Sequence, residues 1–480
     1  MFEAIIKAKS KAELRLLGKL GDIKGHSVTQ DRADFMFRVD AIVSEEDKKR
    51  LESEGYTVEI VSDLSSTAEE RLKEVSRTNR FSNLDTVLDE QGFALEEKYM
   101  NVEEIEAELV NFSKKYPDLV ELIELPNKTW EDRTSNAVLL HSGTVLKRPS
   151  LMFTGGMHAR EWGTSDICMH FVRKLLHSYK NSKPLQYQHK IYSYDQIRKI
   201  LENVDIIVFP DVNPDGKAYS QENIGKPEEM WRKNRNPNPV PYPNPEEGEL
   251  HKPGGVDLNR NFDFLWHSGI STINEDGTDN SQSYRGPEPF SEPESRNVKY
   301  LLDNYKNIKC FVDIHGHVGQ ILMSWGEDDT QCFYPDQNYR NSRYNGKRGK
   351  RESASVVPDP NVYAEYMHPL DATTLINYGQ AMMKGLTAVR NRKYELKPSF
   401  GLYPTSGIAQ DYAFSQRLPN DENRTRIYAY SIEFGQRTDE GPEGHFHPKY
   451  TVMKNIMDDI ASALTELCFR LASENSLSKN

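Results

Sequence analysis

The sequence predicts an α/β protein: a mixed, mostly parallel, twisted sheet with helices on both faces, preceded by a small α+β module. From about residue 100, apolar runs short enough to be buried strands alternate with helix-like stretches, as in a sheet covered on both sides. Before residue 65 the expected elements are shorter and more closely spaced. With 480 residues, the chain can form a core domain of roughly 300 residues and a smaller one.

The predicted N-terminal module spans residues 1–64. Its segments follow the order βαββαβ, which is that of a split-βαβ, ferredoxin-like sandwich. Strands are expected at Phe2–Ala8, near Ser27–Thr29, at Asp34–Val39 and at Tyr56–Val61, and helices at Lys11–Leu20 and Glu45–Glu54. Residues 65–98 are charged, helix-prone and poor in apolar anchors, which predicts a connecting segment before a domain at 99–480.

The larger domain shows the α/β alternation. Buried strands are expected at Ser150–Thr154, Val204–Pro210, Cys310–Ile314 and Ala429–Glu433, and helices at Glu103–Tyr116, 163–180, 292–305, 370–391 and 450–473. Ligands of such sheets bind beyond the carboxyl ends of the strands. His158, Asp211, His315 and Glu433 all lie at or just past the end of an apolar run. Residues 234–255, rich in Pro, Asn, Glu and Gly, predict a long surface loop.

The overall charge argues against two classes of partner. The net charge is -12 and no basic block occurs, so we expect no nucleic-acid partner and no anionic-membrane partner. No apolar run approaches the roughly 20 residues of a membrane helix. The first residues carry acid and base too early for a signal peptide, which leaves the compartment open. The four cysteines form no CxxC pair and are expected to be buried free thiols.

The most informative stretch is His158-Ala-Arg-Glu161, which follows an apolar run and two glycines. Residues three apart share one face of a helical turn, so this imidazole and this carboxylate can converge on one ion. Catalytic zinc commonly takes three protein ligands. The third is expected at another strand end, where His315 is well placed and His317 competes. A second His-x-His pair, at residues 445–447, lies in a Gly/Pro-rich loop and is interpreted as surface.

Two further features suggest a site for a carboxylate-bearing substrate. Glu433 closes an apolar strand, and a carboxylate there is either paired or functional. Asn259 and Arg260 are adjacent in a Gly-rich setting, and a guanidinium binds a carboxylate through two hydrogen bonds. Taken alone, this pair indicates only a surface turn.

Seven motifs in order identify a resemblance. They are Gly156-Met-His158-Ala-Arg-Glu161-Trp162, Asn213-Pro-Asp-Gly216, Trp231-Arg232-Lys233, Gly255-Val-Asp257-Leu-Asn259-Arg260-Asn261, Asp313-Ile-His315, Tyr403-Pro-Thr-Ser-Gly407 and Ile432-Glu433. Together they make residues 100–470 resemble a zinc metallocarboxypeptidase of the pancreatic A/B type. Residues 1–64 resemble that family's prodomain.

The resemblance implies a metal site and a catalytic pair. One Zn²⁺ per chain would be bound by His158, Glu161 and His315, the His₂Glu set known for carboxypeptidase A. The zinc-bound water would be the nucleophile. Glu433 would be the general base that passes the proton to the leaving amine. Arg232 would stabilise the oxyanion.

The resemblance also implies how the substrate is held. Asn259 and Arg260 would bind the terminal carboxylate, assisted by Arg160 and Tyr403. Asp257 would hold the far ring nitrogen of His158.

The resemblance further implies a pocket for the terminal side chain. Aligning from Tyr403 places Gln410 at its base, with Thr405 and Ile408 lining it. Family members that prefer apolar residues have an aliphatic group at this base, and those that prefer Lys or Arg have an Asp. Because Gln410 is neutral and polar, we expect a broad or polar-tolerant pocket.

The expected activity is hydrolysis of the C-terminal peptide bond of peptides or proteins by a monomeric enzyme. Alternatives are a zinc hydrolase of the same fold acting on a cell-wall peptide or an acyl-amino acid, and a non-catalytic or autoinhibited binding relative. The N-terminal module is either a cleaved inhibitory cap or a permanent appendage. Candidate cleavage positions in the connecting segment are Arg71, Lys73, Arg77, Arg80 and Lys98.

Overall fold

The structure is a computed structural model. It describes residues 2–10, 22–30, 36–63, 68–82, 97–143, 148–238, 254–273, 282–349, 360–416, 426–435, 437–438, 441–442 and 446–477.

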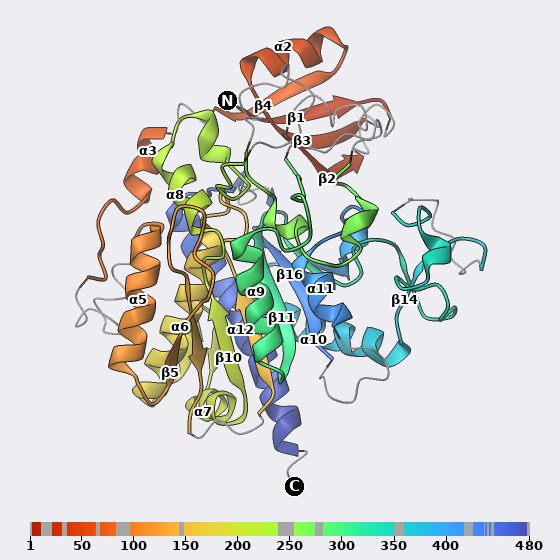
Figure 1. Ribbon diagram of the computed structural model, residues 1–480. Coiled ribbons are helices and arrows are strands. Elements are labelled where there is room, and N and C mark those ends of the chain that lie inside the picture. The colour runs from red at the N-terminus through yellow and green to blue at the C-terminus, as the bar shows by residue number, and fades with distance from the viewer. Residues whose placement is uncertain are drawn as a thin grey trace.

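The N-terminal module is an antiparallel four-stranded sheet with a helix, at one end of the molecule (Figure 1). Its elements are β1 (Phe2–Ala8), β2 (Asp22–Gln30), β3 (Phe37–Val43), α2 (Glu45–Ser53) and β4 (Thr57–Asp63), and the strand order is β2-β3-β1-β4. A capping box between Ser44 and Asp47 starts α2. Ile6, Val39 and Leu51 fill a small core of its own. The helix expected at residues 11–20 lies outside the described residues.

The connecting segment contains α3 (Ala68–Glu74), which is docked on the larger domain. The Arg71 Nε atom lies 2.7 Å from Glu229 Oε1. The Glu74 carboxylate accepts the Tyr450 N–H at 3.0 Å. A parallel bridge joins Val75 to Tyr99. Residues 68–82 therefore pack against the larger domain.

The larger domain is built on an eight-stranded mixed sheet in the order β15-β12-β16-β11-β7-β10-β6-β5. The strands are β5 (Val120–Glu124), β6 (Asn136–Leu140), β7 (Ser150–Thr154), β10 (Asp205–Phe209), β11 (Ile308–Gly316), β12 (Gln320–Met323), β15 (Glu395–Pro398) and β16 (Tyr428–Phe434). The four central strands, β16, β11, β7 and β10, are parallel to one another. Their near-continuous apolar sequence reflects burial on both faces.

Helices cover both faces of this sheet (Figure 1). They are α5 (Val102–Lys115), α6 (Gly163–Lys180), α7 (Tyr194–Asn203), α8 (Pro214–Glu222), α9 (Pro293–Asn304), α10 (Pro369–Arg390), α11 (Ala409–Ser415) and α12 (Tyr450–Leu477). Helix α12 packs against α6, α7 and α10 on one face, and α9 lies across the other. The predicted fold class is confirmed.

The expectation for residues 234–255 is partly wrong. Asn234 and Asn236 are buried, and both side-chain amides donate to the Glu292 carboxylate. Hydrogen bonding to this buried acid holds the start of the loop inside the domain. Residues 239–253 lie outside the described part of the chain.

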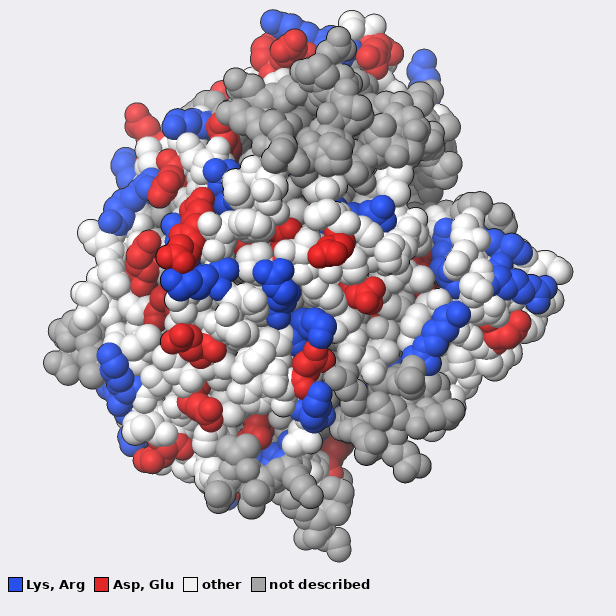
Figure 2. All heavy atoms as spheres, in the orientation of Figure 1, with Lys and Arg blue, Asp and Glu red and all other residues white. Residues whose placement is uncertain are grey.

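The surface in view carries interspersed positive and negative side chains (Figure 2). In the described part of the chain, no helix combines the length and apolar character needed to cross a membrane. The four cysteines are free, and three are buried, while Cys332 is partly exposed.

The sheet order brings three strand ends together. Strand β11 lies between β7 and β16, and His315 pairs in register with Glu433 on β16. Asp313 pairs with Thr154, the last residue of β7. Residues that follow β7 therefore meet the ends of β11 and β16.

Candidate metal centre and active site

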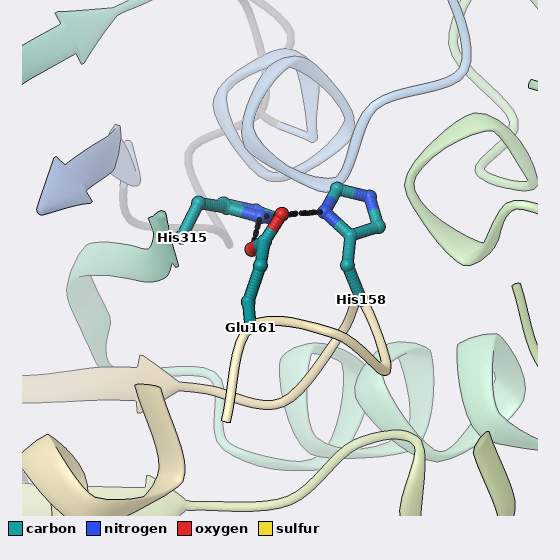
Figure 3. A group of neighbouring side chains, drawn as sticks. All are labelled: His158, Glu161 and His315. Atoms are coloured by element: carbon teal, nitrogen blue, oxygen red, sulfur yellow. Dashed lines mark hydrogen bonds and ion pairs between the residues drawn. The ribbon is translucent and has the colours of Figure 1, made fainter. Parts of the chain in front are cut away.

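Three side chains from two strand ends converge on one point (Figure 3). His158 and Glu161 follow β7, and His315 lies near the end of β11. The His158 Nδ1 atom is 2.9 Å from Glu161 Oε1 and 3.1 Å from His315 Nδ1. The His315 Nδ1 atom is also 3.2 Å from Glu161 Oε2. All three are buried, and within the described ranges they form the one group with the spacing of a metal site.

The outer nitrogens of both imidazoles contact buried carboxylates. The His158 Nε2 atom lies 3.2 Å from Asp257 Oδ1, and the His315 Nε2 atom lies 2.6 Å from Asp313 Oδ2. A ring that donates its Nε2 proton to a carboxylate presents a lone pair at Nδ1. Two such lone pairs and the Glu161 carboxylate then face one another. Three acceptors at one point fit a cation, and the His₂Glu donor set fits zinc.

His317 does not join this group. Its ring is buried and lies 5.0 Å from the Phe446 ring. Of the two histidines that compete for the third ligand position, His315 is the one in the cluster.

Arg232 lies at the edge of the cluster. Its Nε and Nη2 atoms donate to Asp257 Oδ2 at 3.0 and 2.9 Å, and its Nη1 atom is 3.3 Å from His158 Nδ1. Asp257 thus bridges Arg232 and His158. Burial raises the pKa of Asp257, but the charges of Arg232 and Arg260 outweigh burial and hold that pKa well below its ordinary value.

Glu433 projects from β16 beside His315 and is partly exposed. Burial raises the pKa of Glu433 from the ordinary 4.5 to about 8. The charge of His315 lowers this pKa, and the charge of Glu161 raises it further. A carboxyl group with this pKa is suited to proton transfer near neutral pH.

A second group of polar side chains lies next to the metal centre. The Asn259 Nδ2 atom is 3.3 Å from His315 Nε2, and its Oδ1 accepts the Ala409 N–H at 2.9 Å. The Arg260 Nη2 atom donates to the Tyr403 hydroxyl at 2.8 Å. The structure therefore brings Asn259, Arg260 and Tyr403 together beside the metal cluster.

Arg160 contacts a different part of the site. Its guanidinium lies 4.2 Å from the centre of the Phe446 ring and donates to the Met230 carbonyl at 3.3 Å. Phe446 also contacts His317. Sequence reasoning missed Phe446, although it lies between the two histidines of the second His-x-His pair.

The interpretation of the second His-x-His pair as surface is wrong for His447. Its ring is buried and stacks on Trp162 with centroids 3.7 Å apart, and its Nδ1 atom lies 3.2 Å from Glu229 Oε1. Stacking and the ion pair hold this ring in the interior. His445 lies outside the described residues.

Gln410 is buried on α11, with its Nε2 atom 3.5 Å from Ser324 Oγ.

Asp313 was not predicted to have a role. The motif Asp313-Ile-His315 nevertheless indicated one, because residues two apart on a strand share a face.

Comparisons with known proteins agree with this geometry. A family model described as zinc carboxypeptidase matches residues 105–461. Carboxypeptidase B of Astacus astacus is 32% identical over 357 residues, which cover 74% of this chain and 91% of that protein. Carboxypeptidase O of Bos taurus is 25% identical over 375 residues, which cover 77% of this chain and 78% of that protein.

Solved structures share the fold over nearly the whole chain. Thrombin activatable fibrinolysis inhibitor superposes with a TM-score of 0.67 at 18% identity, covering 98% of this chain and 99% of that one. Carboxypeptidase A from Helicoverpa armigera gives a TM-score of 0.66 at 20% identity, covering 100% of this chain and 98% of that one. The family match and the converging His₂Glu set lead to one conclusion: the chain belongs to the zinc carboxypeptidase family and is a zinc-dependent metallocarboxypeptidase that acts on peptides or proteins.

Proposed function

We propose that this enzyme releases the C-terminal residue of its substrates with Glu433 as general base, Arg232 as oxyanion-stabilising group and Asn259-Arg260 as the carboxylate-binding pair. The observation that supports this most strongly is the juxtaposition of two groups. The Asn259 amide lies 3.3 Å from His315 of the metal-binding cluster, and the next residue, Arg260, donates to the Tyr403 hydroxyl, which makes an Arg-Tyr pair that can bind an anion. An exopeptidase needs both a hydrolytic centre and a reader of the free carboxylate, at a fixed separation.

The Arg260 guanidinium and the Asn259 amide would bind the terminal carboxylate, with Tyr403 adding a hydroxyl donor. This places the last peptide bond at the metal cluster. Arg160, whose guanidinium contacts the Phe446 ring, is proposed to assist in binding this carboxylate.

Zinc bound by His158, Glu161 and His315 would polarise the scissile carbonyl and make a bound water acidic. Arg232 is adjacent and donates hydrogen bonds to the carbonyl oxygen as it becomes negative. Glu433 accepts a proton from the attacking water and delivers it to the leaving nitrogen. Water is consumed, the peptide bond breaks, and one amino acid and a shortened peptide leave.

Asp257 and Asp313 orient the two imidazoles. Each carboxylate contacts the outer ring nitrogen, which fixes the tautomer that faces the metal. Because Asp257 also binds Arg232, it would hold a metal ligand and the oxyanion-stabilising group in one geometry.

The chain is proposed to divide into a prodomain-like module at 1–64, a connecting segment at 65–98 and a catalytic domain at 99–480. If the module is released by cleavage after a basic residue, the exposed Lys73, Arg77 and Lys98 are more accessible than Arg71 and Arg80, which are paired with Glu229 and Glu104. If the module is a permanent appendage, full activity needs no cleavage.

The test combines zinc content with amino-acid release from a mixed peptide panel, before and after limited proteolysis. The Glu433→Gln variant should bind zinc like the wild type but lose turnover. Glu395→Gln, at an exposed carboxylate on β15, is the matched control and should stay active. Retained turnover in Glu433→Gln would contradict the base assignment. Zinc binding with hydrolysis of acyl-amino acids alone would contradict the peptide substrate.

A further inference from the structure

The segment that follows Tyr403 runs from the carboxylate-binding pair towards the pocket expected for the terminal side chain. The Gly407 N–H donates to the Phe264 carbonyl, and the Ala409 N–H donates to Asn259 Oδ1. A substrate whose carboxylate lies on Asn259 and Arg260 therefore has this segment beside its last side chain. This step rests on the proposed function.

Four polar side chains gather around Gly326 on this segment and on the strand end facing it; we call Thr405, Gln410, Asp411 and Glu327 the acceptor cluster. A Cβ atom on Gly326 would lie 2.5 Å from Thr405 Oγ1 and 3.0 Å from Asp411 Oδ2. The backbones are tied as well, since the Gly326 N–H donates to Asp411 Oδ2 at 2.8 Å and the Thr405 N–H donates to the Gly326 carbonyl at 2.8 Å.

Five oxygens of the cluster have no hydrogen-bond partner within the described residues. Three belong to the carboxyl groups of Asp411 and Glu327, and the other two belong to neutral side chains. These two are Thr405 Oγ1 and Gln410 Oε1, on side chains that are 5% and 1% exposed. The Gln410 Nε2 atom lies 3.5 Å from Ser324 Oγ, and the carbonyl oxygen of the same amide has no partner among the described residues. Buried polar atoms without partners are rare in proteins and call for an explanation. A ligand with N–H donors would supply it.

The other two side chains of the cluster are carboxyl groups that interact with each other. Asp411 and Glu327 are fully buried, and no ion pair to a cation is found for either among the described residues. Burial raises the pKa of Asp411 to about 7 and that of Glu327 well above its ordinary value, where Glu365 adds to the effect. A nearby cation would favour the ionised form of both and stabilise their burial.

We propose that this enzyme prefers substrates whose C-terminal side chain is cationic, lysine or arginine, with Thr405 and Gln410 as hydrogen-bond acceptors and Asp411 and Glu327 as the source of negative charge. An apolar side chain would leave the oxygens of Thr405 and Gln410 unsatisfied. A neutral amide would supply donors but no charge. The negative charge comes from positions other than 410, so the neutral Gln410 does not preclude a basic preference.

The experiment measures kcat/KM for peptides that differ only in the last residue: Arg, Lys, Gln, Leu or Phe. The zinc-loaded full chain is assayed before and after limited proteolysis. Because hydrogen bonds to a charged group are strong, kcat/KM for the Arg or Lys peptide should exceed that for the Leu peptide by about tenfold or more. A wild-type preference for Leu or Phe overturns the inference but leaves the proposed function intact. If no amino acid is released from any peptide, the proposed function fails and this inference falls with it.

Two variants locate the charge. Asp411→Asn and Glu327→Gln should each lower the ratio of kcat/KM for the Arg peptide to kcat/KM for the Leu peptide at least about fivefold. Asp328→Asn is the matched control, because its carboxylate is occupied by the N–H groups of Asp329 and Gly349. An unchanged ratio in both cluster variants, or an equal loss in the control, overturns the assignment. If the variants do not fold, the wild-type panel alone decides.

Discussion

Replacing Asp313 with asparagine tests whether this carboxylate fixes the tautomer of a zinc ligand. Asp313 is fully buried and contacts His315 Nε2 at 2.6 Å, and its other oxygen accepts the Thr154 hydroxyl at 2.6 Å. Asparagine has one oxygen for two donors. If the oxygen faces His315, only the negative charge is lost. If it faces Thr154, the amide N–H₂ group meets the ring and forces its proton to Nδ1, where the metal should bind.

Loss of such a partner weakens metal binding by about 10- to 100-fold, or about 1.4–2.7 kcal/mol, and the tautomer change gives the upper end. The assay is zinc competition against a chelating dye at pH 7, with circular dichroism to confirm folding. Asp458→Asn is the control, because it breaks a similar contact, 2.9 Å to His170, away from the site. Zinc affinity within about twofold of wild type in Asp313→Asn would refute the reasoning.

Three other predictions concern single residues. Arg232→Ala should lower kcat by about 10²–10³-fold with the fold intact, measured by steady-state kinetics; a change only in KM would refute its role at the oxyanion. His315→Ala should lose zinc by metal analysis while His317→Ala keeps it, and the reverse result would exchange their roles. Burial raises the pKa of Glu294 to about 8 against 4.5 for an ordinary glutamate, so the folded state binds the extra proton. Stability should then fall as pH rises from about 4.5 to about 8, by up to about 1.4 kcal/mol per pH unit, and Glu294→Gln should flatten urea-derived stability over this range; an unchanged slope would contradict the shift.

The central strands could be predicted from sequence because burial on both faces demands an unbroken apolar run. Ser150–Thr154 has the same bounds in the structure as in the sequence. The edge strands were missed for the opposite reason. β5 mixes buried, partly exposed and exposed residues, and β15 is a short, mostly polar segment that ends in proline. Such segments become strands only through the neighbour they pair with.

Two of the three metal ligands are close in sequence, whereas the contacts that bury His447 come from distant parts of the chain. His158 and Glu161 share one turn and were found together, and His315 followed from its place at a strand end. The burial of His447 depends on Trp162 and Glu229, which lie far away in the chain. Because a Gly/Pro-rich loop carries no periodicity, nothing near His447 indicated that its ring is in the interior.

The docked segment at residues 68–82 has a practical consequence for where the chain can be cut. Glu104 is buried and relies on Arg80 and the Ser76 hydroxyl, and Glu229 shares its charge with Arg71 and His447. A recombinant protein that began at residue 99 would keep every proposed catalytic group yet lose both arginines, and an unpaired buried carboxylate typically costs about 3–5 kcal/mol. The shortest stable form of the enzyme is therefore longer than the shortest form that contains every proposed catalytic group. After cleavage at Lys98, the released peptide would stay bound through its ion pairs.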